Sequence, residues 1–313
     1  MTKKALIVGH TGQDGFYLTQ ILEAHNYSVY GLSSTGNYHS KGESFEHGNL
    51  LDVAFAERLI TAIQPDELYY LAAVHQSSVE QSFDDLSFYK QTLDVNANAY
   101  LNVLNALVKL VPNCKVFYAS SSHIFGGTAS HMQNEDTPVC PVSIYGVSKV
   151  LGMHFSDLYR QKGLDVSCGI LYNHESPRRH SKFVSKKIVE TAVKIYNKEA
   201  TELVLGDLSA TIDWGYAPDY MQAAHLIVNA GKPGNYVISS GHLYTVQDFL
   251  EAVFDQLGLQ WRDYVKENKG LILKRSVTIL KGDSSKLRQT TGWNNSVDLK
   301  GMIAILLESE LNK

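Results

Sequence analysis

The chain has little cysteine, little net charge and no long apolar run. Only three of its 313 residues are cysteines, Cys114, Cys140 and Cys168, and they are widely spaced and odd in number. This usage argues against a disulfide framework or a cysteine metal site and favours a reducing compartment. A formal net charge of −4 without a basic stripe argues against a nucleic-acid partner.

Two further absences concern membranes and metals. No apolar run approaches the roughly 18 residues of a membrane-spanning helix, and no signal-peptide pattern is found. The 12 histidines, among them His25, His75, His131, His154 and His225, are scattered and show no ligand spacing, so we expect most of the 12 to be hydrogen-bonded or solvent-facing. We therefore expect a cytoplasmic protein that binds no membrane, no nucleic acid and no metal.

The sequence alternates between strand-like apolar runs and amphipathic, helix-like stretches. Such alternation is typical of a parallel sheet with helices on both faces. A chain of 313 residues exceeds the usual size of a single core, which indicates one large domain and a smaller lobe. We predict an α/β fold: a Rossmann-type doubly wound parallel sheet with a smaller, interleaved substrate-binding lobe. Residues 1–170 are expected to form the dinucleotide-binding domain, with 213–240 returning to it, and 171–313 mainly the substrate-binding lobe.

The predicted elements share these two patterns. The predicted strands are residues 5–8, 28–32, 67–73, 115–119, 165–172, 201–205 and 236–239. The predicted helices are residues 16–24, 92–108, 143–162, 183–198, 221–230, 246–257 and 299–311.

Three glycines follow the first apolar run directly. Gly9, Gly12 and Gly15 come after residues 5–8. A strand that turns sharply into a helix needs glycine where φ is positive and where the backbone approaches a pyrophosphate, and the helix N-terminus offers free N–H groups to that anion. Alone, this spacing also fits a strand–helix turn without a ligand. The helix over 16–24 and the strand that follows complete a βαβ unit and favour a dinucleotide site.

A second motif places a phenol and an amine one helical turn apart. Tyr145 and Lys149 share a helix face because four positions separate them. A tyrosine with its ordinary pKa of about 10 is a poor base, and we expect the Lys149 ammonium to lower the pKa of Tyr145 toward neutrality. The spacing alone also fits a surface pair. Serines 120–122 favour catalysis, because they follow the strand 115–119 and open α/β sheets bind ligands at the carboxyl ends of strands.

Longer strings extend these motifs over nearly the whole chain. They include TGQDG at 11–15, LAA at 71–73, NHESPRR at 173–179, DWG at 213–215 and GW at 292–293. In these strings the chain resembles an extended short-chain dehydrogenase/reductase that modifies sugar nucleotides. The NHESPRR string is the most specific, and through it the chain is most similar to the GDP-mannose 4,6-dehydratase family.

The resemblance implies which residues form the site. The expected catalytic residues are Ser121, His123, Tyr145 and Lys149. The expected cofactor contacts are Gly9, Thr11, Gly12, Gln13, Asp14, Gly15, Ser33, Asn49, Leu50, Leu71, Ala72, Ala73, Tyr145 and Lys149. The expected substrate contacts are Asn173, Glu175, Arg178, Arg179, Lys187 and Arg275, with Lys186 and Arg288 as further basic candidates.

Two departures from the family pattern bear on the chemistry. His123 stands where the family has a glutamate that handles the proton at C5 and the leaving water at C6. A histidine can transfer protons near neutral pH, and a structural, hydrogen-bonded role is equally open. Ser33 and Ser34 stand where the family has arginines for the 2′-phosphate of NADP, which favours NAD, with His39 and Lys41 able to approach the ribose.

We therefore expect NAD(P)-dependent oxidation at C4 of a GDP-mannose-type sugar nucleotide, a hexose or a heptose, to a 4-keto sugar. The resemblance leaves open complete 4,6-dehydration to a 4-keto-6-deoxy sugar, and a C4 reductase or epimerase. A non-catalytic dinucleotide-binding sensor is the alternative from another class, and Ser121, Tyr145 and Lys149 together disfavour it. The expected partner is a GDP-sugar, and we expect a homo-oligomer, a dimer or a tetramer.

Overall fold

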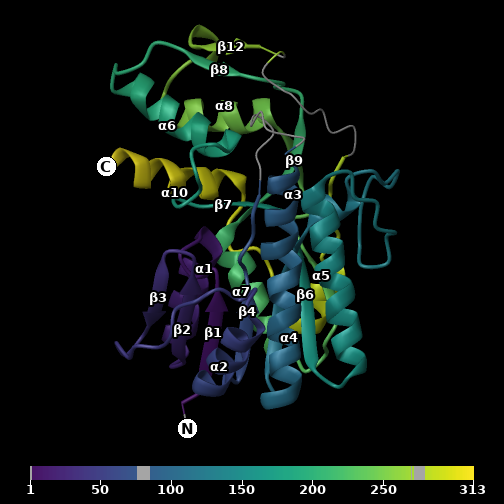
Figure 1. Cartoon of the computed structure of the whole chain (residues 1–313). Helices are drawn as coiled ribbons and strands as arrows, with labels where there is room; N and C mark the ends of the chain where they lie inside the picture. Colours follow the sequence, from purple (N-terminus) through teal and green to yellow (C-terminus); the bar gives the residue numbers. More distant parts are fainter. Residues whose placement is uncertain (1, 76–84, 269, 271–278) are drawn as a thin grey trace.

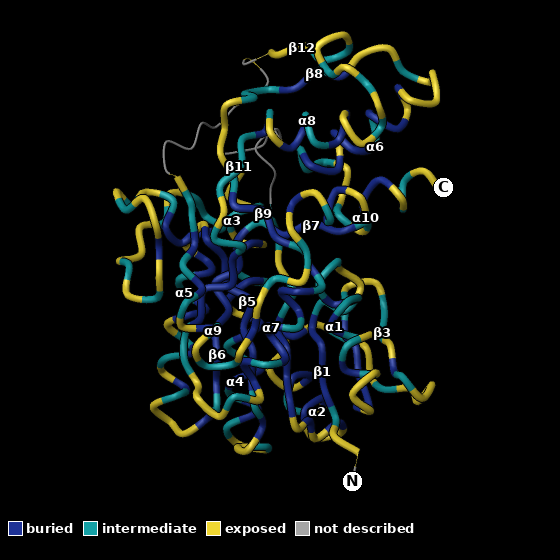
Figure 2. The backbone as a smooth tube through the Cα atoms, turned by 180° about the vertical axis from the view of Figure 1, so that it is seen from behind, coloured by how far each residue is buried: buried dark blue, intermediate teal, exposed yellow. Residues whose placement is uncertain are grey.

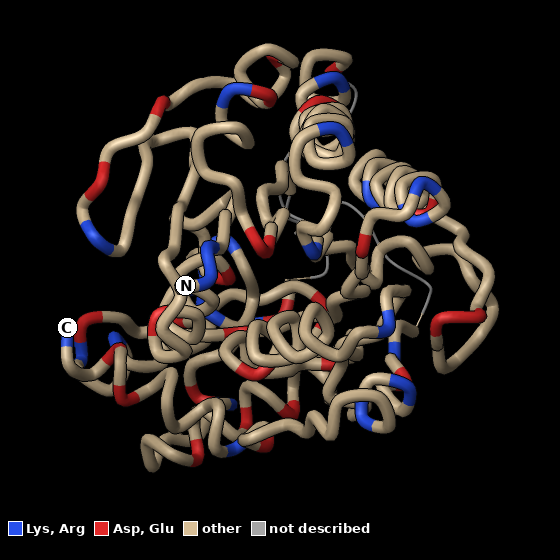
Figure 3. Tube along the Cα trace, turned by 90° about the horizontal axis from the view of Figure 1, so that it is seen from below, with Lys and Arg blue, Asp and Glu red and all other residues tan. Residues whose placement is uncertain are grey.

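The computed structural model of the chain describes residues 2–75, 85–268, 270 and 279–313. Figure 1 shows two parts: a large sheet with flanking helices, which contains the N-terminus, and a smaller group of helices and short strands beyond one end of that sheet. In Figure 2 the buried segments run along the strands of the large sheet and along the inner sides of the helices. Figure 3 shows acidic and basic residues interspersed over the molecule.

Seven strands form the large sheet. Their order is β10-β6-β5-β4-β1-β2-β3, and every neighbouring pair is parallel except β2 and β3. The central strands read as continuous apolar runs because helices cover both faces. This is the Rossmann-type doubly wound sheet that the sequence predicts. The strands are β1 (Lys4–Val8), β2 (Ser28–Ser33), β3 (Gly36–His39), β4 (Glu67–Tyr70), β5 (Lys115–Ser121), β6 (Asp165–Leu171) and β10 (Asn235–Ile238).

Helices connect these strands in two directions from β1. The chain passes from β1 through α1 to β2 on one side, and through β4 to β5 on the other. Right-handed crossovers that run in opposite directions place their helices on opposite faces of the sheet. Accordingly α1 packs against α7, and α4 packs against α2 and α5. The helices of this part are α1 (Gln13–Ala24), α2 (Val53–Ile63), α3 (Leu86–Leu93), α4 (Ala99–Leu110), α5 (Ile144–Gln161), α7 (Ala217–Asn229) and α9 (Ser285–Thr291).

The smaller part has its own buried cluster. Helices α6, α8 and α10 pack on one another, and Trp214 lies against Phe249 with 4.9 Å between ring centres. Its strands form a three-stranded sheet, β11-β9-β7, and a pair, β12-β8. The elements are β7 (Asn173–Glu175), α6 (Val184–Tyr196), β8 (Leu203–Leu205), β9 (Thr211–Tyr216), β11 (Leu243–Thr245), α8 (Val246–Gln256), the 3-10 turn η3 (Trp261–Asp263), β12 (Val265–Glu267) and α10 (Leu299–Leu311). No helix in the described residues is both long and apolar enough to cross a membrane.

Helix α5 begins where the sequence predicts because a serine caps it. The Ser143 hydroxyl accepts a hydrogen bond from the N–H of Gly146 (3.1 Å). Further along, Gly152 lets the helix lie close to β5, since a Cβ there would be 2.2 Å from the Tyr118 ring. The helix is therefore held tightly against the strand that carries Ser121.

The predicted helix over 92–108 is not one continuous α-helix. α3 passes through a π-helical turn, η1 (Asp94–Asn98), into α4. The buried Asn96 lies in this turn; its side chain donates to Val74 O (3.1 Å) and Ser148 Oγ (3.0 Å) and accepts from Val74 N (2.8 Å). The extra residue in the turn directs Asn96 toward the segment after β4, and single π turns often serve such a purpose.

We predict that Asn96→Ala lowers the free energy of unfolding by about 2 kcal/mol or more, because the half-buried N–H and C=O of Val74 lose their Asn96 partner and the buried Ser148 hydroxyl loses a donor. Asn98→Ala is the matched control. Asn98 lies in the same turn but is exposed, and its side chain donates to Asp94, so its loss should cost about 0.5 kcal/mol or less. Chemical denaturation of both variants measures the difference, and equal losses would contradict the role given to Asn96.

Candidate active site

The loop after β1 forms a cradle at the carboxyl edge of the large sheet. Gly9 has φ +97° and donates its N–H to Leu32 O (2.7 Å). A Cβ at Gly9 would lie 2.7 Å from the Ala72 nitrogen, and one at Gly15 would lie 2.4 Å from the Gly9 oxygen. These two glycines are required because the loop folds on itself and on the segment that follows β4.

Gly12 has no such requirement from the protein. Its φ of −69° and ψ of 170° suit any residue, and the nearest atom to a Cβ built there is the Gly9 oxygen, at 3.4 Å. Gly12 also precedes α1 without a side-chain cap for the first N–H groups of the helix. A bound anion that approaches the backbone closely would use both features. The cradle therefore fits the pyrophosphate of a dinucleotide.

The segment after β4 lies beside the cradle. The N–H groups of Leu71 and Ala72 both donate to Val8 O, each at 2.9 Å. Thr11 and Ala73 are exposed, while Leu71 and Ala72 are half-buried. The structure thus brings together the expected cofactor contacts after β1 and after β4.

Ser33, Asn49 and Leu50 differ in how much of each residue is free to contact a dinucleotide. The Ser33 hydroxyl bonds to Thr35 Oγ1 (3.1 Å) and donates to Gly36 O (3.0 Å), inside the turn between β2 and β3. Asn49 is exposed, whereas the Leu50 side chain is buried in the core. Leu50 therefore offers only its backbone to a ligand.

His39 is not available to a ribose, contrary to expectation. Its ring is buried; Nδ1 accepts from Glu43 N (3.0 Å), so the proton sits on Nε2, which donates to Ser28 Oγ (2.9 Å). The hairpin of β2 and β3, which the sequence analysis did not include, produces this arrangement. Lys41 follows the hairpin and is exposed.

Ser121, Tyr145 and Lys149 meet where β5 ends and α5 begins. The Ser121 hydroxyl lies near enough to the Tyr145 phenol to favour the ionised form of that phenol. The buried Lys149 donates from Nζ to Ala119 O (2.7 Å), and Nζ lies 5.6 Å from the centre of the Tyr145 ring. All three predicted residues therefore lie together.

The charge states of this group differ from expectation. Burial raises the pKa of Tyr145 to about 12, against the opposing effect of the nearby Ser121 hydroxyl. Burial lowers the pKa of Lys149 to about 7, although the charge of Asp14 acts in the other direction. The expected lowering of the Tyr145 pKa is therefore wrong for the protein without a ligand. The phenol's loss of hydration outweighs the effect of the Lys149 ammonium, which is hydrogen-bonded to the Ala119 carbonyl.

His123 lies directly beside Tyr145. It belongs to the 3-10 turn η2 (Ser122–Phe125), its N–H donates to Ser121 Oγ (3.3 Å), and its ring centre is 5.6 Å from that of Tyr145. Solvent reaches part of the side chain, yet the surrounding protein displaces enough water to lower its pKa. His123 is therefore a neutral imidazole at ordinary pH.

His75 is a site residue that the sequence analysis missed. Its ring centre is 4.5 Å from that of Tyr145, at an interplanar angle of 90°, and 5.8 Å from that of His123, while its other face stacks on Phe183 at 5.7 Å. The expectation of a hydrogen-bonded or solvent-facing ring is wrong at Nδ1, which is buried without a hydrogen-bond partner in the described residues. Burial, reinforced by neighbouring charges such as that of Arg179, lowers its pKa to about 3. The available signal was its position two residues after Ala73, at a strand end.

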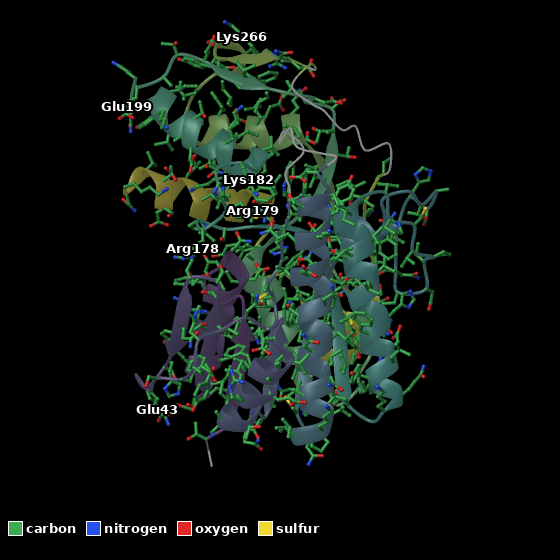
Figure 4. All side chains as sticks on the ribbon, in the orientation of Figure 1. Glu43, Arg178, Arg179, Lys182, Glu199 and Lys266 are labelled. Carbon is green, nitrogen blue, oxygen red and sulfur yellow. The ribbon has the colours of Figure 1, made fainter. Side chains whose placement is uncertain are left out.

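The 173–179 string forms β7 and the loop after it. Glu175 is buried and pairs with Arg179, whose Nε lies 3.1 Å from Glu175 Oε2. Arg179 also lies over the Phe183 ring (3.5 Å), and the exposed Arg178 lies over the Phe16 ring (4.0 Å). Figure 4 shows both arginines and Lys182 where the helices of the smaller part approach the large sheet. Glu175 thus holds Arg179 in place, and Asn173 at the start of β7 is half-buried.

Other basic candidates are engaged elsewhere. Lys187 is exposed and donates to Val204 O on β8 (2.8 Å), and Lys186 is buried against Glu310 (2.7 Å). Arg288 lies 3.8 Å from Asp283 on the large-sheet side. Arg275 lies outside the described residues. In the described ranges, no group of three or more histidine, cysteine or acidic side chains is arranged to hold a metal ion.

This fold and geometry define a class of enzyme. A doubly wound sheet with a glycine loop after β1, and a serine, tyrosine and lysine between β5 and α5, is that of an extended short-chain dehydrogenase/reductase. The sequence model described as GDP-mannose 4,6 dehydratase matches residues 6–306. The chain therefore belongs to the GDP-mannose 4,6-dehydratase family, and the prediction of an NAD(P)-dependent sugar-nucleotide enzyme is confirmed.

Curated relatives and solved structures agree with this. The chain is 37% identical to GDP-mannose 4,6 dehydratase 2 of Arabidopsis thaliana, with 99% of this chain and 87% of the relative covered. It is 32% identical to GDP-mannose 4,6-dehydratase of Vibrio cholerae, with 99% and 94% covered. RMD from Pseudomonas aeruginosa, complexed with NADPH, has a TM-score of 0.83 at 21% identity, covering 100% of this chain and 98% of that one. The dTDP-glucose 4,6-dehydratase of Bacillus anthracis, in complex with NAD, has a TM-score of 0.83 at 17% identity, covering 100% and 97%. At these identities the two structures confirm the fold.

We predict that His75→Leu lowers kcat by about tenfold or more, because Tyr145 loses the ring that holds it. His75→Phe should retain most of the wild-type kcat, since a phenyl ring keeps the edge-to-face contact. Steady-state kinetics on both variants, with thermal unfolding as the check on folding, measures this. If both variants lose activity equally, a nitrogen of His75 is required and packing is not its role.

Proposed function

We propose that the protein oxidises C4 of a GDP-mannose-type sugar nucleotide, a hexose or a heptose, to a 4-keto sugar and passes the hydride to a nicotinamide dinucleotide. The observation that carries this proposal is the convergence of Ser121, Tyr145 and Lys149 close to the cradle after β1. The names of the curated relatives support GDP-mannose as the model for the substrate. The exposed Arg178 and the nearby Arg179 are the fork-shaped donors that a diphosphate favours.

Each of the three residues has a separate task. Ser121 holds the C4 hydroxyl, and Tyr145 takes its proton. The phenol has a pKa of about 12, so it acts as a base only when positive charge gathers beside it. Lys149 supplies such charge in its protonated form, which it holds below a pKa of about 7. A bound nicotinamide dinucleotide supplies the hydride acceptor.

NAD is the dinucleotide that the β2 end favours. The Ser33 hydroxyl is occupied within its own turn, and His39 is buried in a neutral form. A 2′-phosphate needs cationic donors. Of Ser33, His39 and Lys41, only the exposed Lys41 is a cationic side chain. The two solved structures named above carry NADPH in one case and NAD in the other, which supports the class of cofactor.

Complete 4,6-dehydration is the second candidate. The curated relatives carry that name, and two imidazoles, His75 and His123, lie within 6 Å of the Tyr145 ring centre. Water loss needs a group that removes the C5 proton and donates a proton to the C6 hydroxyl. The family glutamate is replaced by His123, whose pKa burial lowers, so the uncharged imidazole is a poor donor of the proton that the departing C6 hydroxyl needs. We therefore favour oxidation without water loss.

We predict that Tyr145→Phe lowers turnover by about 10²-fold or more, the usual effect of a positioned base, and leaves the Kd of the dinucleotide nearly unchanged. Tyr159→Phe is the control, because Tyr159 lies on the same helix with its ring over the Lys162 ammonium. Stopped-flow reduction of the dinucleotide and calorimetric titration measure the two effects. Normal turnover by the Tyr145 variant would remove the proposed base.

We predict that NAD binds more tightly than NADP. Calorimetric titration of dinucleotide-free protein with each compound measures the preference. Lys41→Ala should leave NAD binding unchanged, because a diol needs no cation. Tighter NADP binding that falls in the Lys41 variant would show that this lysine supplies a phosphate site.

We predict a product from GDP-mannose that is lighter by two hydrogens and retains its C6 hydroxyl. Mass spectrometry of the reaction of the purified protein tests this, with borodeuteride trapping of the ketone to locate the carbonyl. Loss of water by the unmodified protein would instead establish dehydration and give His123, His75 or both the acid–base role. His123→Glu should increase any water loss, because it restores the family carboxylate.

A further inference from the structure

The glycine loop and the 173–179 string are joined by side-chain hydrogen bonds. His174 Nε2 lies 3.0 and 3.1 Å from the two carboxylate oxygens of Asp14. Gln13 Nε2 donates to His174 O (3.1 Å), and the Ser176 hydroxyl donates to Gln13 Oε1 (2.7 Å). The side chains of Gln13 and Asp14, which the sequence analysis assigned to the cofactor, are therefore directed to β7 and its loop.

The partners of His174 determine its protonation. Nδ1 lies 2.7 Å from Tyr172 O, a carbonyl oxygen that only accepts. Nε2 faces the Asp14 carboxylate, which also only accepts. Both ring nitrogens must donate for both contacts to be hydrogen bonds, so the geometry requires an imidazolium. Asp14 and His174 then form an ion pair across the boundary between α1 and β7.

Other groups surround this pair. Burial opposes the charge on His174, Asp14 favours it, and Arg179 opposes it. Tyr220 on α7 lies against the ring, with 4.8 Å between ring centres. The charge of Arg179 also lowers the pKa of Asp14. The Asp14 carboxylate in turn acts to raise the pKa of Tyr145 and of Lys149. Asp14 is the anion among these that directly faces the imidazolium.

The position of Asp14 gives the pair a consequence for ligand binding. Asp14 is the second residue of α1, in the first turn, where the uncapped N–H groups point to the cradle. A carboxylate and a pyrophosphate compete for the same positive helix end and repel each other. The imidazolium removes most of that repulsion, because it neutralises the carboxylate at hydrogen-bond distance.

We propose that His174 is a positioning residue whose imidazolium neutralises Asp14 and thereby permits tight binding of a dinucleotide pyrophosphate at the start of α1. This rests on the proposed function only in that a dinucleotide occupies the cradle. His174 contacts neither the dinucleotide nor the sugar nucleotide and acts through Asp14. Binding of the dinucleotide and protonation of His174 are then linked.

The sign of the pH dependence follows from this linkage. Although burial alone would lower it, the Asp14 charge and hydrogen bond raise the pKa of His174 above its usual 6.5. The pKa of Asp14 lies below its usual 3.8, because the contacts with His174 outweigh burial. Both charges are therefore present from about pH 4 to above pH 6.5, and the cation is lost as the pH rises through the raised pKa of His174. Dinucleotide affinity should fall over that same upper range.

Calorimetric titration of dinucleotide-free, full-length protein with NAD between about pH 6 and about pH 9 tests the proposal. We expect Kd to rise by about tenfold, within the usual range of coupling between sites. Titrations in two buffers of different ionisation enthalpy should show proton uptake on binding near the midpoint. A Kd that does not change with pH, without proton uptake, would overturn the proposal while leaving the proposed function intact. Absence of NAD binding at every pH would instead refute the proposed function.

Two variants separate the charge from the packing. Asp14→Asn should remove the rise in Kd that deprotonation of His174 causes and leave only the change due to Lys149, whose pKa is about 7. It should bind NAD more tightly than the wild type at high pH, because no carboxylate remains to repel the pyrophosphate. His174→Gln should lose the tighter binding that the protonated His174 gives the wild type at low pH. His154→Gln, an exposed histidine on α5, is the matched control and should keep the wild-type profile. An Asp14→Asn profile identical to the wild type would overturn the proposal.

Nitrogen-15 NMR of labelled histidine provides a readout that needs no activity and no altered fold. The His174 resonance, assigned from its loss in His174→Gln, should be that of an imidazolium at pH 6.5 in the free protein. A neutral imidazole at that pH would contradict the ion pair from which the proposal starts.

Discussion

The site depends on the parallel pairing of β1, β4 and β5. Val8 pairs with Tyr70, and Tyr70 pairs with Tyr118, so the carboxyl ends of three strands lie at one edge. The chain turns in opposite directions from β1, which leaves this edge open between α1 and the helices on the other side. Because of this pairing, Gly9, Ala72 and Ser121 lie along one edge of the sheet although they are far apart in the sequence.

Burial is the second constraint, and it controls the charges at that edge. The same helices that cover the sheet enclose Tyr145 and Lys149, and the pKa of the phenol rises to about 12 while that of the amine falls to about 7. His75 stays neutral for the same reason. His174 is the exception, since a carboxylate at 3.0 Å outweighs its loss of hydration. At His174 the charge persists because an opposite charge is in direct contact.

The fold class and the main motifs could be predicted from the sequence, because hydrophobic periodicity and glycine spacing are local properties. The βαβ unit around Gly9 and the i, i+4 pair of Tyr145 and Lys149 depend only on neighbouring residues. The π turn at Asn96 was not predictable, since it depends on a contact with Val74 that exists only in the folded chain. The role of His75 was missed for the same reason: its partners are Tyr145 and Phe183, both distant in sequence. The pKa of Tyr145 was wrong because a sequence shows the nearby ammonium but not the depth of burial.

In the proposed reaction, the hydrogen on C4 of the sugar leaves as hydride at this site. A GDP-mannose labelled with deuterium at C4 tests it most directly, with mass spectrometry of both the sugar and the dinucleotide after reaction. Deuterium should leave C4 and be found on the reduced nicotinamide. Deuterium found at C6 would show that oxidation at C4 is followed by dehydration. Deuterium that stays on C4 while product forms would contradict the account, because the reaction would then not begin by oxidation at that carbon.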